Sequence, residues 1–274
     1  MHRFFVPPEL LAPVQTLNGA VPEPVQELRI TLPEKIAHQV RDVLHLGTGE
    51  QLALLDNSGA ETIASVVKSN RTVVEVQVVE RHPGKDEPPV RIILCQGLLK
   101  SARFEWILEK GTELGVSVFV PTLCRRSMAG LEEAGSAKVQ RWQRIIQEAA
   151  EQCDRSRLPE LLPVRPLPDA LNTIPEGALA LMPWEEEREL SLHTALNSVI
   201  QVRQTLADGQ TLVAPEKSIT TVVLFIGPEG GLTTEEVALA RRYGVQIVTL
   251  GERVLRAETA ALATIAIVVY EFGG

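Results

Sequence analysis

The chain has 274 residues, of which 45% are hydrophobic and 23% charged, proportions typical of a globular protein with one large domain or two smaller ones. Its net charge of −8 argues against a protein whose whole surface binds nucleic acid, although it permits a local basic patch. No segment approaches the roughly 18 consecutive apolar residues of a membrane span. The first residues lack the apolar core of a signal peptide, so we expect a cytoplasmic protein.

Residues 1–80 are typical of a compact β-rich domain of the small-barrel type. Short β-branched segments are separated by turns that contain glycine and asparagine, which is the pattern of strands in such domains. Val74, Val76 and Val78 alternate with polar residues, which predicts a strand with one solvent-exposed face. One short helix is expected at 34–44. The predicted strands are 51–56, 62–67 and 72–79.

Residues 81–89 contain two consecutive prolines and several charges, and we expect a linker without regular structure there. From residue 90, apolar strands alternate with longer helices, which indicates an α/β domain. Thr233 and Glu236 form a capping-box sequence before one of these helices. Residues 207–218 are typical of an exposed excursion. The expected strands are 90–97, 116–120, 179–182, 221–226 and 245–250, and the expected helices are 101–114, 138–153, 191–206, 234–243 and 258–271.

Two glycine-bearing loops near the end of the chain give the clearest indication of a ligand site. Residues 227–231, Gly-Pro-Glu-Gly-Gly, follow one apolar strand, and residues 250–260 follow the next. Ligands bind at the carboxyl ends of strands in open α/β sheets, so we expect one pocket built from both loops. The first loop matches neither common nucleotide-loop motif, and a tight turn that binds no ligand remains the alternative.

Arg256 and Glu258 are the candidate catalytic side chains of the second loop. The alternative is an Arg–Glu pair that only caps the start of a helix. That helix is apolar on nearly all sides, which predicts burial in the sheet or against a partner subunit.

Basic residues gather at strand and helix ends despite the acidic total. Arginines at such positions can bind phosphate through two parallel hydrogen bonds, although each taken singly is more simply explained as a solvated charge. These residues are Lys100, Arg103, Lys110, Arg125, Arg126, Arg155 and Arg157.

The sequence offers no pattern for metal binding or hydrolysis. Cys95, Cys124 and Cys153 stand far apart, which argues against disulfides or a zinc site and indicates thiols in a reducing compartment. The histidines occur in no ligand spacing and beside no nucleophile. Ser127 and Ser191 lack the glycine pattern of a nucleophile elbow.

An ordered set of motifs runs through the chain. The motifs are residues 3–6, 110–116, Arg126-Ser127, 148–153 with Arg155, 226–232 and 250–260. This set resembles the bacterial 16S ribosomal RNA uridine-N3 methyltransferases of the SPOUT superfamily, and the resemblance covers essentially the whole chain. The two C-terminal motifs together are its most specific part.

The resemblance implies an α/β fold with a SPOUT-type trefoil-knotted parallel sheet at 90–274. It also implies an N-terminal PUA-like β-barrel at 1–80 that helps to hold RNA, joined through the linker at 81–89. A homodimer is implied, which binds S-adenosylmethionine in the knotted loops. Its activity would be methylation of N3 of a specific uridine in 16S rRNA of the small ribosomal subunit, by in-line attack and without a metal.

The resemblance also implies roles for particular residues. Arg256 is expected to stabilise the developing anion or to orient the base. The expected RNA-binding residues are Arg3, Lys100, Arg103, Arg125, Arg126 and Arg155. The expected cofactor-binding residues are Leu181, Met182, Pro183, Gly227, Pro228, Gly230, Leu250, Gly251, Val254 and Leu255.

This chain departs from the family pattern at some positions. Ala257 stands where the family often has threonine, and His45 stands where an arginine commonly follows Val43-Leu44, which puts an RNA contact of the first domain in doubt. Two other functions stay open: a SPOUT enzyme that acts on another RNA, and a non-catalytic RNA-binding assembly factor. The intact glycines argue against the second, and calorimetry with S-adenosylmethionine would distinguish it.

Overall fold

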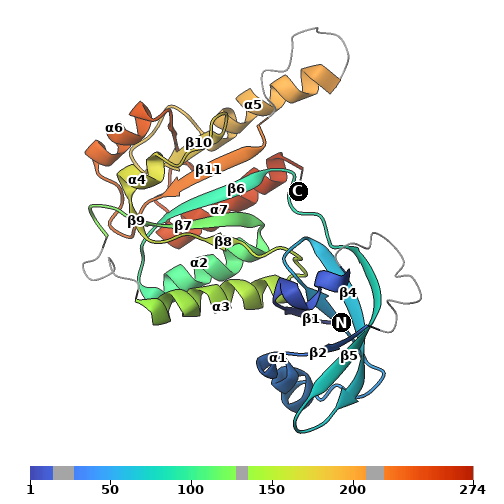
Figure 1. The fold of residues 1–274 in the computed structure, drawn as a ribbon. Coiled ribbons are helices and arrows are strands. Elements are labelled where there is room, and N and C mark those ends of the chain that lie inside the picture. The colour runs from blue at the N-terminus through green and yellow to red at the C-terminus, as the bar shows by residue number, and fades with distance from the viewer. Residues whose placement is uncertain (15–27, 128–134, 208–218, 274) are drawn as a thin grey trace. The chain divides into compact units, whose positions relative to one another are not determined.

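The computed structural model describes residues 1–14, 28–127, 135–207 and 219–273 (Figure 1). Contacts divide the chain into two units, the first formed by Met1–Asp86 and Gln147–Leu158 and the second by Glu87–Ile146 and Pro159–Gly274. Residues 147–158 thus group with the first unit, whereas the sequence division placed them in the second domain. Most of the excursion predicted at 207–218 lies outside the described residues.

The first unit is built on a five-stranded sheet with the order β1-β3-β4-β5-β2. β1 runs parallel to β3, and the other neighbours are antiparallel. Among the described residues β1 and β2 do not pair with each other, so the sheet is open where the sequence led us to expect a barrel. The strands are β1 (His2–Phe5), β2 (Arg29–Thr31), β3 (Gln51–Leu55), β4 (Ala60–Ser69) and β5 (Val74–Pro83).

The core of the first unit follows the predicted alternation. Val74, Val76 and Val78 of β5 are buried, and the polar residues between them are more exposed. The predicted helix is present as α1 (Glu34–His38), which continues as a π-helix over Gln39–Val43 and packs Ile36 and Val40 into the same core.

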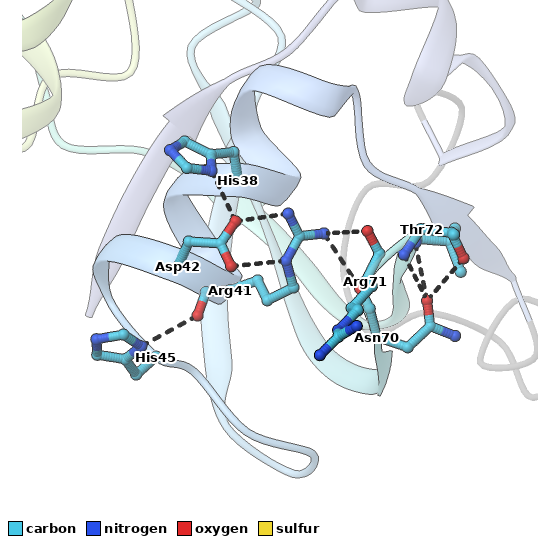
Figure 2. A network of polar contacts seen from close by, with 8 residues as sticks. His38, Arg41, Asp42, His45, Asn70, Arg71 and Thr72 are labelled. Atoms are coloured by element: carbon cyan, nitrogen blue, oxygen red, sulfur yellow. Dashed lines mark hydrogen bonds and ion pairs between the residues drawn. The ribbon is translucent and has the colours of Figure 1, made fainter.

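A polar network joins the end of this helix to the turn between β4 and β5 (Figure 2). Arg41 binds the Asp42 carboxylate through Nε and Nη2, and its Nη1 donates to the carbonyl oxygens of Asn70 and Arg71. The Arg41 hydrogen bond lowers the pKa of Asp42 to about 2. His45 adopts a left-handed backbone conformation (φ 54°) and pairs through Nδ1 with the Arg41 carbonyl oxygen.

β5 extends through Pro83, so the interpretation of 81–89 as an irregular linker is wrong for its first three residues, which pair with β4. The contacts of Arg81 explain why the strand continues into these residues. Its side chain is buried and donates to Thr62 Oγ1 at 2.8 Å and to Asp56 Oδ2 at 3.0 Å. Burial alone would raise the pKa of Asp56, but hydrogen bonds from Ser58 and Arg81 outweigh it and lower the pKa.

We expect Arg81→Ala to lower the free energy of unfolding by about 3–5 kcal/mol, because it removes the guanidinium that pairs with the buried Asp56 carboxylate. Urea denaturation at neutral pH measures the loss. Since the folded pKa of Asp56 is lowered, its contribution is present above about pH 4, the ordinary aspartate pKa, and is lost as the pH falls further.

Lys68→Ala is the matched control for this prediction, because the Lys68–Glu75 pair is exposed. Loss of an exposed pair costs at most about 1 kcal/mol. Equal losses in the two variants would contradict the role given to Arg81.

The second unit is a parallel sheet with the order β12-β10-β11-β6-β7-β8, and β9 pairs with a further part of β7. The strands are β6 (Arg91–Gly97), β7 (Val116–Leu123), β8 (Glu160–Leu161), β9 (Arg165–Pro166), β10 (Leu179–Pro183), β11 (Thr221–Ile226) and β12 (Gln246–Val248). The helices are α2 (Ser101–Glu113), α3 (Ser136–Gln152), α4 (Leu167–Leu171), α5 (Leu192–Ala207), α6 (Thr234–Arg242) and α7 (Ala257–Glu271).

Both faces of this sheet are covered by helices (Figure 1). Val222, Leu224 and Ile226 of β11 enter a core shared with α2, α3, α5 and α7. Val223 and Phe225 enter the opposite core, shared with α4 and α6. Burial on both faces explains why the central strands are continuous apolar runs.

The predicted α/β pattern is confirmed, with differences at the edges. α4, β8 and β9 were not predicted, and they are too short to show a periodic pattern. β12 ends at Val248, earlier than expected. The capping box of α6 forms as predicted between Thr233 and Glu236. Within the described part of the chain, no helix is long and apolar enough to cross a membrane.

The described residues cover only part of the surface of α7. Ala261, Ile265 and Val268 are buried in the core. Ile267 and Tyr270 are 40% and 78% exposed, so one apolar face of the helix remains open to solvent.

Candidate functional site

A cavity of about 390 Å³ lies where β10, β11 and β12 of the second unit end. Its walls include residues 226–232 of the first glycine loop and residues 249–257 of the second. The expectation that both loops build one pocket is therefore confirmed. Arg103, Trp184 and Glu185 also line the cavity, and Trp184 and Glu185 were not among the predicted site residues.

The glycines of the first loop are required by close packing. A Cβ at Gly230 would lie 2.9 Å from Arg126 Cβ, and one at Gly231 would lie 2.6 Å from Glu185 Oε1. Gly231 also has a φ of +73°, which residues other than glycine rarely adopt. The loop is thus both a tight turn and a wall of the cavity.

Buried polar groups hold the backbone of this loop. Gln96, which is 1% exposed at the end of β6, donates from Nε2 to the carbonyl oxygen of Gly97 at 3.0 Å and of Gly227 at 3.4 Å. Arg126 Nη1 donates to the carbonyl oxygen of Gly230 at 3.2 Å. Gln96 was missed because nothing in its neighbouring sequence links it to a loop so far along the chain.

Two pocket-side ion pairs connect different elements. Arg103 of α2 donates from Nη1 to Glu229 Oε1 at 3.1 Å, and its Nε lies 3.6 Å from Glu258 Oε1. Glu258 therefore pairs with Arg103 in the described structure, and the alternative of an Arg256–Glu258 cap at the start of α7 does not hold. Arg256 is the N-cap residue of α7 without a side-chain capping bond, and it is exposed on the cavity wall.

Most of the predicted cofactor-binding residues line the cavity, and some of the predicted residues do not. Leu181 and Met182 are buried within β10 and do not line the cavity, whereas Pro183 does. Arg125 and Lys100 are exposed in the second unit. The other predicted cofactor residues all line the cavity: Gly227, Pro228, Gly230, Leu250, Gly251, Val254 and Leu255.

Arg3 and Arg155 belong to the first unit and take no part in this cavity. Arg3 forms ion pairs with Glu61 at 2.6 Å and Asp154 at 2.7 Å, and its side chain is 11% exposed. That pairing ties β1 to β4 and to residues 147–158 within the first unit.

The chemistry available in the cavity is that of arginines, carboxylates and backbone groups. Among the described residues, no cluster of three or more His, Cys, Asp or Glu side chains could hold a metal ion. Burial raises the pKa of the Cys95 thiol to about 12 and raises that of Cys124 as well, so neither is a thiolate at neutral pH.

The second unit is thus an open parallel α/β fold with a ligand cavity at the carboxyl ends of its strands. Residues 86–269 match the family described as RNA methyltransferase domain. A Synechocystis protein named ribosomal RNA small subunit methyltransferase E is 32% identical, over 89% of this chain and 74% of that protein. A Bacillus subtilis protein of the same name is 29% identical, over 85% of this chain and 87% of that protein.

The chain therefore belongs to the RNA methyltransferase family whose curated members include the ribosomal RNA small subunit methyltransferases E. A crystal structure of such a protein from Neisseria gonorrhoeae, bound to S-adenosyl methionine, matches with a TM-score of 0.78 at 27% identity. The match covers 97% of this chain and 96% of that one. The family that the sequence motifs indicated is thereby confirmed.

We expect Gly97→Ala to destabilise the second unit by about 1–3 kcal/mol or more, because the new Cβ would lie 2.6 Å from the backbone nitrogen of Pro228. Neither the end of β6 nor the loop can yield without moving a cavity wall. Urea denaturation measures the effect.

Gly47→Ala serves as the control, since its Cβ would meet only Glu50 Oε2 at 3.6 Å, an ordinary contact. We expect a change within about 0.5 kcal/mol there. A Gly97 variant as stable as the wild type would show that the loop is not packed as described.

Proposed function

We propose that this chain transfers a methyl group from S-adenosylmethionine to N3 of a specific uridine in 16S ribosomal RNA, in the cytoplasm. The observation that carries the proposal is the cavity that both glycine loops build together, in a chain whose curated relatives are named for methylation of small-subunit ribosomal RNA. The Neisseria relative is described as bound to S-adenosyl methionine, which supports this donor.

The residues of the cavity fit a nucleoside-sized methyl donor. Its volume of about 390 Å³ lies within the range usual for small-molecule sites. Glycines at 227, 230 and 231 let the backbone approach a ligand closely, and Val254 and Leu255 offer apolar contact. Leu181 and Met182 support the site through the buried end of β10. When bound, the donor supplies an electrophilic methyl group on its sulfonium, so no metal is needed.

The protein must then hold the target base and favour loss of the proton from N3. Both tasks depend on orientation and on positive charge placed beside the developing anion. Arg256 lies exposed on the cavity wall at the start of α7, and we assign it the role of stabilising that anion or orienting the base.

RNA would be held by basic residues beside the cavity and by the first unit, which we take to be a PUA-like RNA-binding unit. Lys100 and Arg125 are exposed and suited to phosphate contacts, and Arg155 of the first unit is half-buried. Arg126 already donates a hydrogen bond to the carbonyl oxygen of Gly230 in the glycine loop. Arg3 is committed to its two ion pairs, so we now assign it to the stability of the first unit.

The SPOUT-type trefoil knot and the homodimer implied by the resemblance complete the proposal. The open apolar face of α7, with Ile267 and Tyr270, is the surface that supports dimerisation. An uncovered face of this kind on an otherwise well-packed helix is typical of an interface.

The first experiment asks whether methylation occurs and where. Small ribosomal subunits from cells that lack this gene are incubated with the protein and S-adenosylmethionine, and methylated uridines are located by mass mapping. We expect one N3-methyluridine in 16S rRNA. If calorimetry shows no S-adenosylmethionine binding, the chain is an RNA-binding assembly factor instead.

We expect Arg256→Ala to lower turnover by about 10²–10³-fold, because it removes positive charge that acts on the reacting base. The affinity for S-adenosylmethionine should stay within about twofold of the wild type, since backbone groups are expected to hold the donor. Arg242→Ala, at the exposed end of α6 and away from the cavity, is the control and should keep full turnover. Unchanged turnover in the Arg256 variant would exclude this role.

We expect Tyr270→Lys to shift the protein from dimer to monomer in sedimentation velocity, because a buried lysine at the interface would be uncompensated. Tyr243→Lys is the matched control, since Tyr243 is also exposed but lies at the end of α6. A wild-type chain that sediments as a monomer at micromolar concentration would refute the dimer.

A further inference from the structure

One arginine between two glutamates connects three elements beside the cavity. Arg103 comes from the first turn of α2, Glu229 from the first glycine loop, and Glu258 from the first turn of α7. Arg103 and Glu229 both line the cavity, and their side chains are 41% and 22% exposed. The cluster is therefore accessible to a ligand on the cavity side.

The charge of this cluster does not suit a phosphate. One guanidinium stands against two carboxylates, which leaves a net charge of about −1 when all three are ionised. An RNA phosphate would have to approach Arg103 against this excess negative charge. Arg103 is thus better suited to a neutral ligand than to the RNA backbone contact assigned to it from the sequence.

A uracil base has complementary polar groups. Its N3–H donor lies between two carbonyl acceptors, O2 and O4. Among the described residues, the Glu229 carboxylate has only Arg103 as a polar partner, so it keeps the capacity to accept another hydrogen. The two carbonyl oxygens could accept from arginines on the same cavity wall, where Arg103 and Arg256 lie. A cytosine presents an acceptor at N3, which a carboxylate would repel.

Glu258 holds Arg103 from the other side. Its side chain is 13% exposed, and its Oε2 is buried with no hydrogen-bond partner in the described part of the chain. Arg103 and the positive end of α7 are therefore what compensates its charge. This arrangement fixes the guanidinium, and through it the orientation of the Glu229 carboxylate.

Resting on the function proposed above, we propose that Glu229 accepts the N3 proton of the target uridine and that Arg103 is its positioning residue. As the N3–H bond breaks, the proton passes to Glu229 and the electron pair stays on N3. N3 forms the bond to the methyl carbon while the carbon–sulfur bond breaks, and its electron pair remains on sulfur. Glu229 then returns the proton to water.

Other charged groups share the cavity with Glu229 and affect any pH profile. Glu185 follows β10, and Glu252, Arg253 and Arg256 belong to the second loop. Arg126 holds the glycine loop beside them. None of these is removed in the test variant, so their contribution is common to the compared proteins.

The test compares Glu229→Gln with the wild type in single-turnover methylation of small ribosomal subunits from cells that lack the gene, as a function of pH. We expect the rate at neutral pH to fall by about 10²–10⁴-fold, the usual contribution of a proton acceptor. The difference in rate between the variant and the wild type should decrease as the pH rises, because hydroxide can accept the proton in place of the missing carboxylate. Calorimetry without RNA should give an S-adenosylmethionine affinity within about twofold of the wild type.

Glu186→Gln is the control, because Glu186 is an exposed glutamate outside the cavity lining. A Glu229→Gln variant with wild-type rate would overturn the inference. So would a variant whose cofactor affinity falls as much as its rate while the shape of the pH profile is unchanged, since that is a structural role. A wild-type protein that binds no S-adenosylmethionine would instead overturn the function proposed above, and this inference with it.

An Arg103→Lys variant distinguishes the positioning role of Arg103 from the effect of its positive charge. Lysine keeps the positive charge but cannot contact both glutamates through a rigid fork. We expect turnover to fall by about tenfold at every pH, with the wild-type shape of the pH profile and wild-type salt dependence of RNA binding. A weaker salt dependence would show that Arg103 contacts phosphate, and would overturn its assignment.

Discussion

The close approach of the β6 end to the loop after β11 is the constraint on which the second unit depends. At Gly97 the two backbones come so near that even a methyl group would lie 2.6 Å from the Pro228 nitrogen. Gln96 then joins the same two segments by hydrogen bonds. The cavity wall is therefore held by close backbone packing together with the buried side chain of Gln96. Arg126 adds a hydrogen bond to the Gly230 carbonyl oxygen on the other side of the loop.

The charged side chains of the cavity come from elements other than the first glycine loop as well. Arg103 comes from a helix that precedes the first glycine loop by more than a hundred residues, and Arg256 from the start of the last helix. Parallel strands make this possible, because all their carboxyl ends meet at one edge of the sheet. The same topology forces the central strands to be apolar on both faces, as β11 is.

Much of the second unit could be predicted because its signals are local. Apolar runs mark β6 and β11, and Thr233 with Glu236 marks the start of α6. The pocket could be predicted from strand ends alone. The pairs Arg103–Glu229 and Gln96–Gly227 could not, because they join residues 126 and 131 positions apart and have no signature in either segment. In the first unit, β1 and β2 were missed for the same reason: they are short, and their partners are distant in sequence.

The first unit is discontinuous along the chain, and this affects the order in which the protein can be completed on the ribosome. The Phe5 N–H donates to Glu151 Oε1, Arg3 pairs with Asp154, and the Leu158 N–H donates to Asn57 Oδ1. These three partners are synthesised long after β1 to β5. The N-terminal sheet therefore lacks these three contacts until residue 158 has left the exit tunnel. A truncated product that ends before that point would lack the same contacts, and with them part of the first unit's stability.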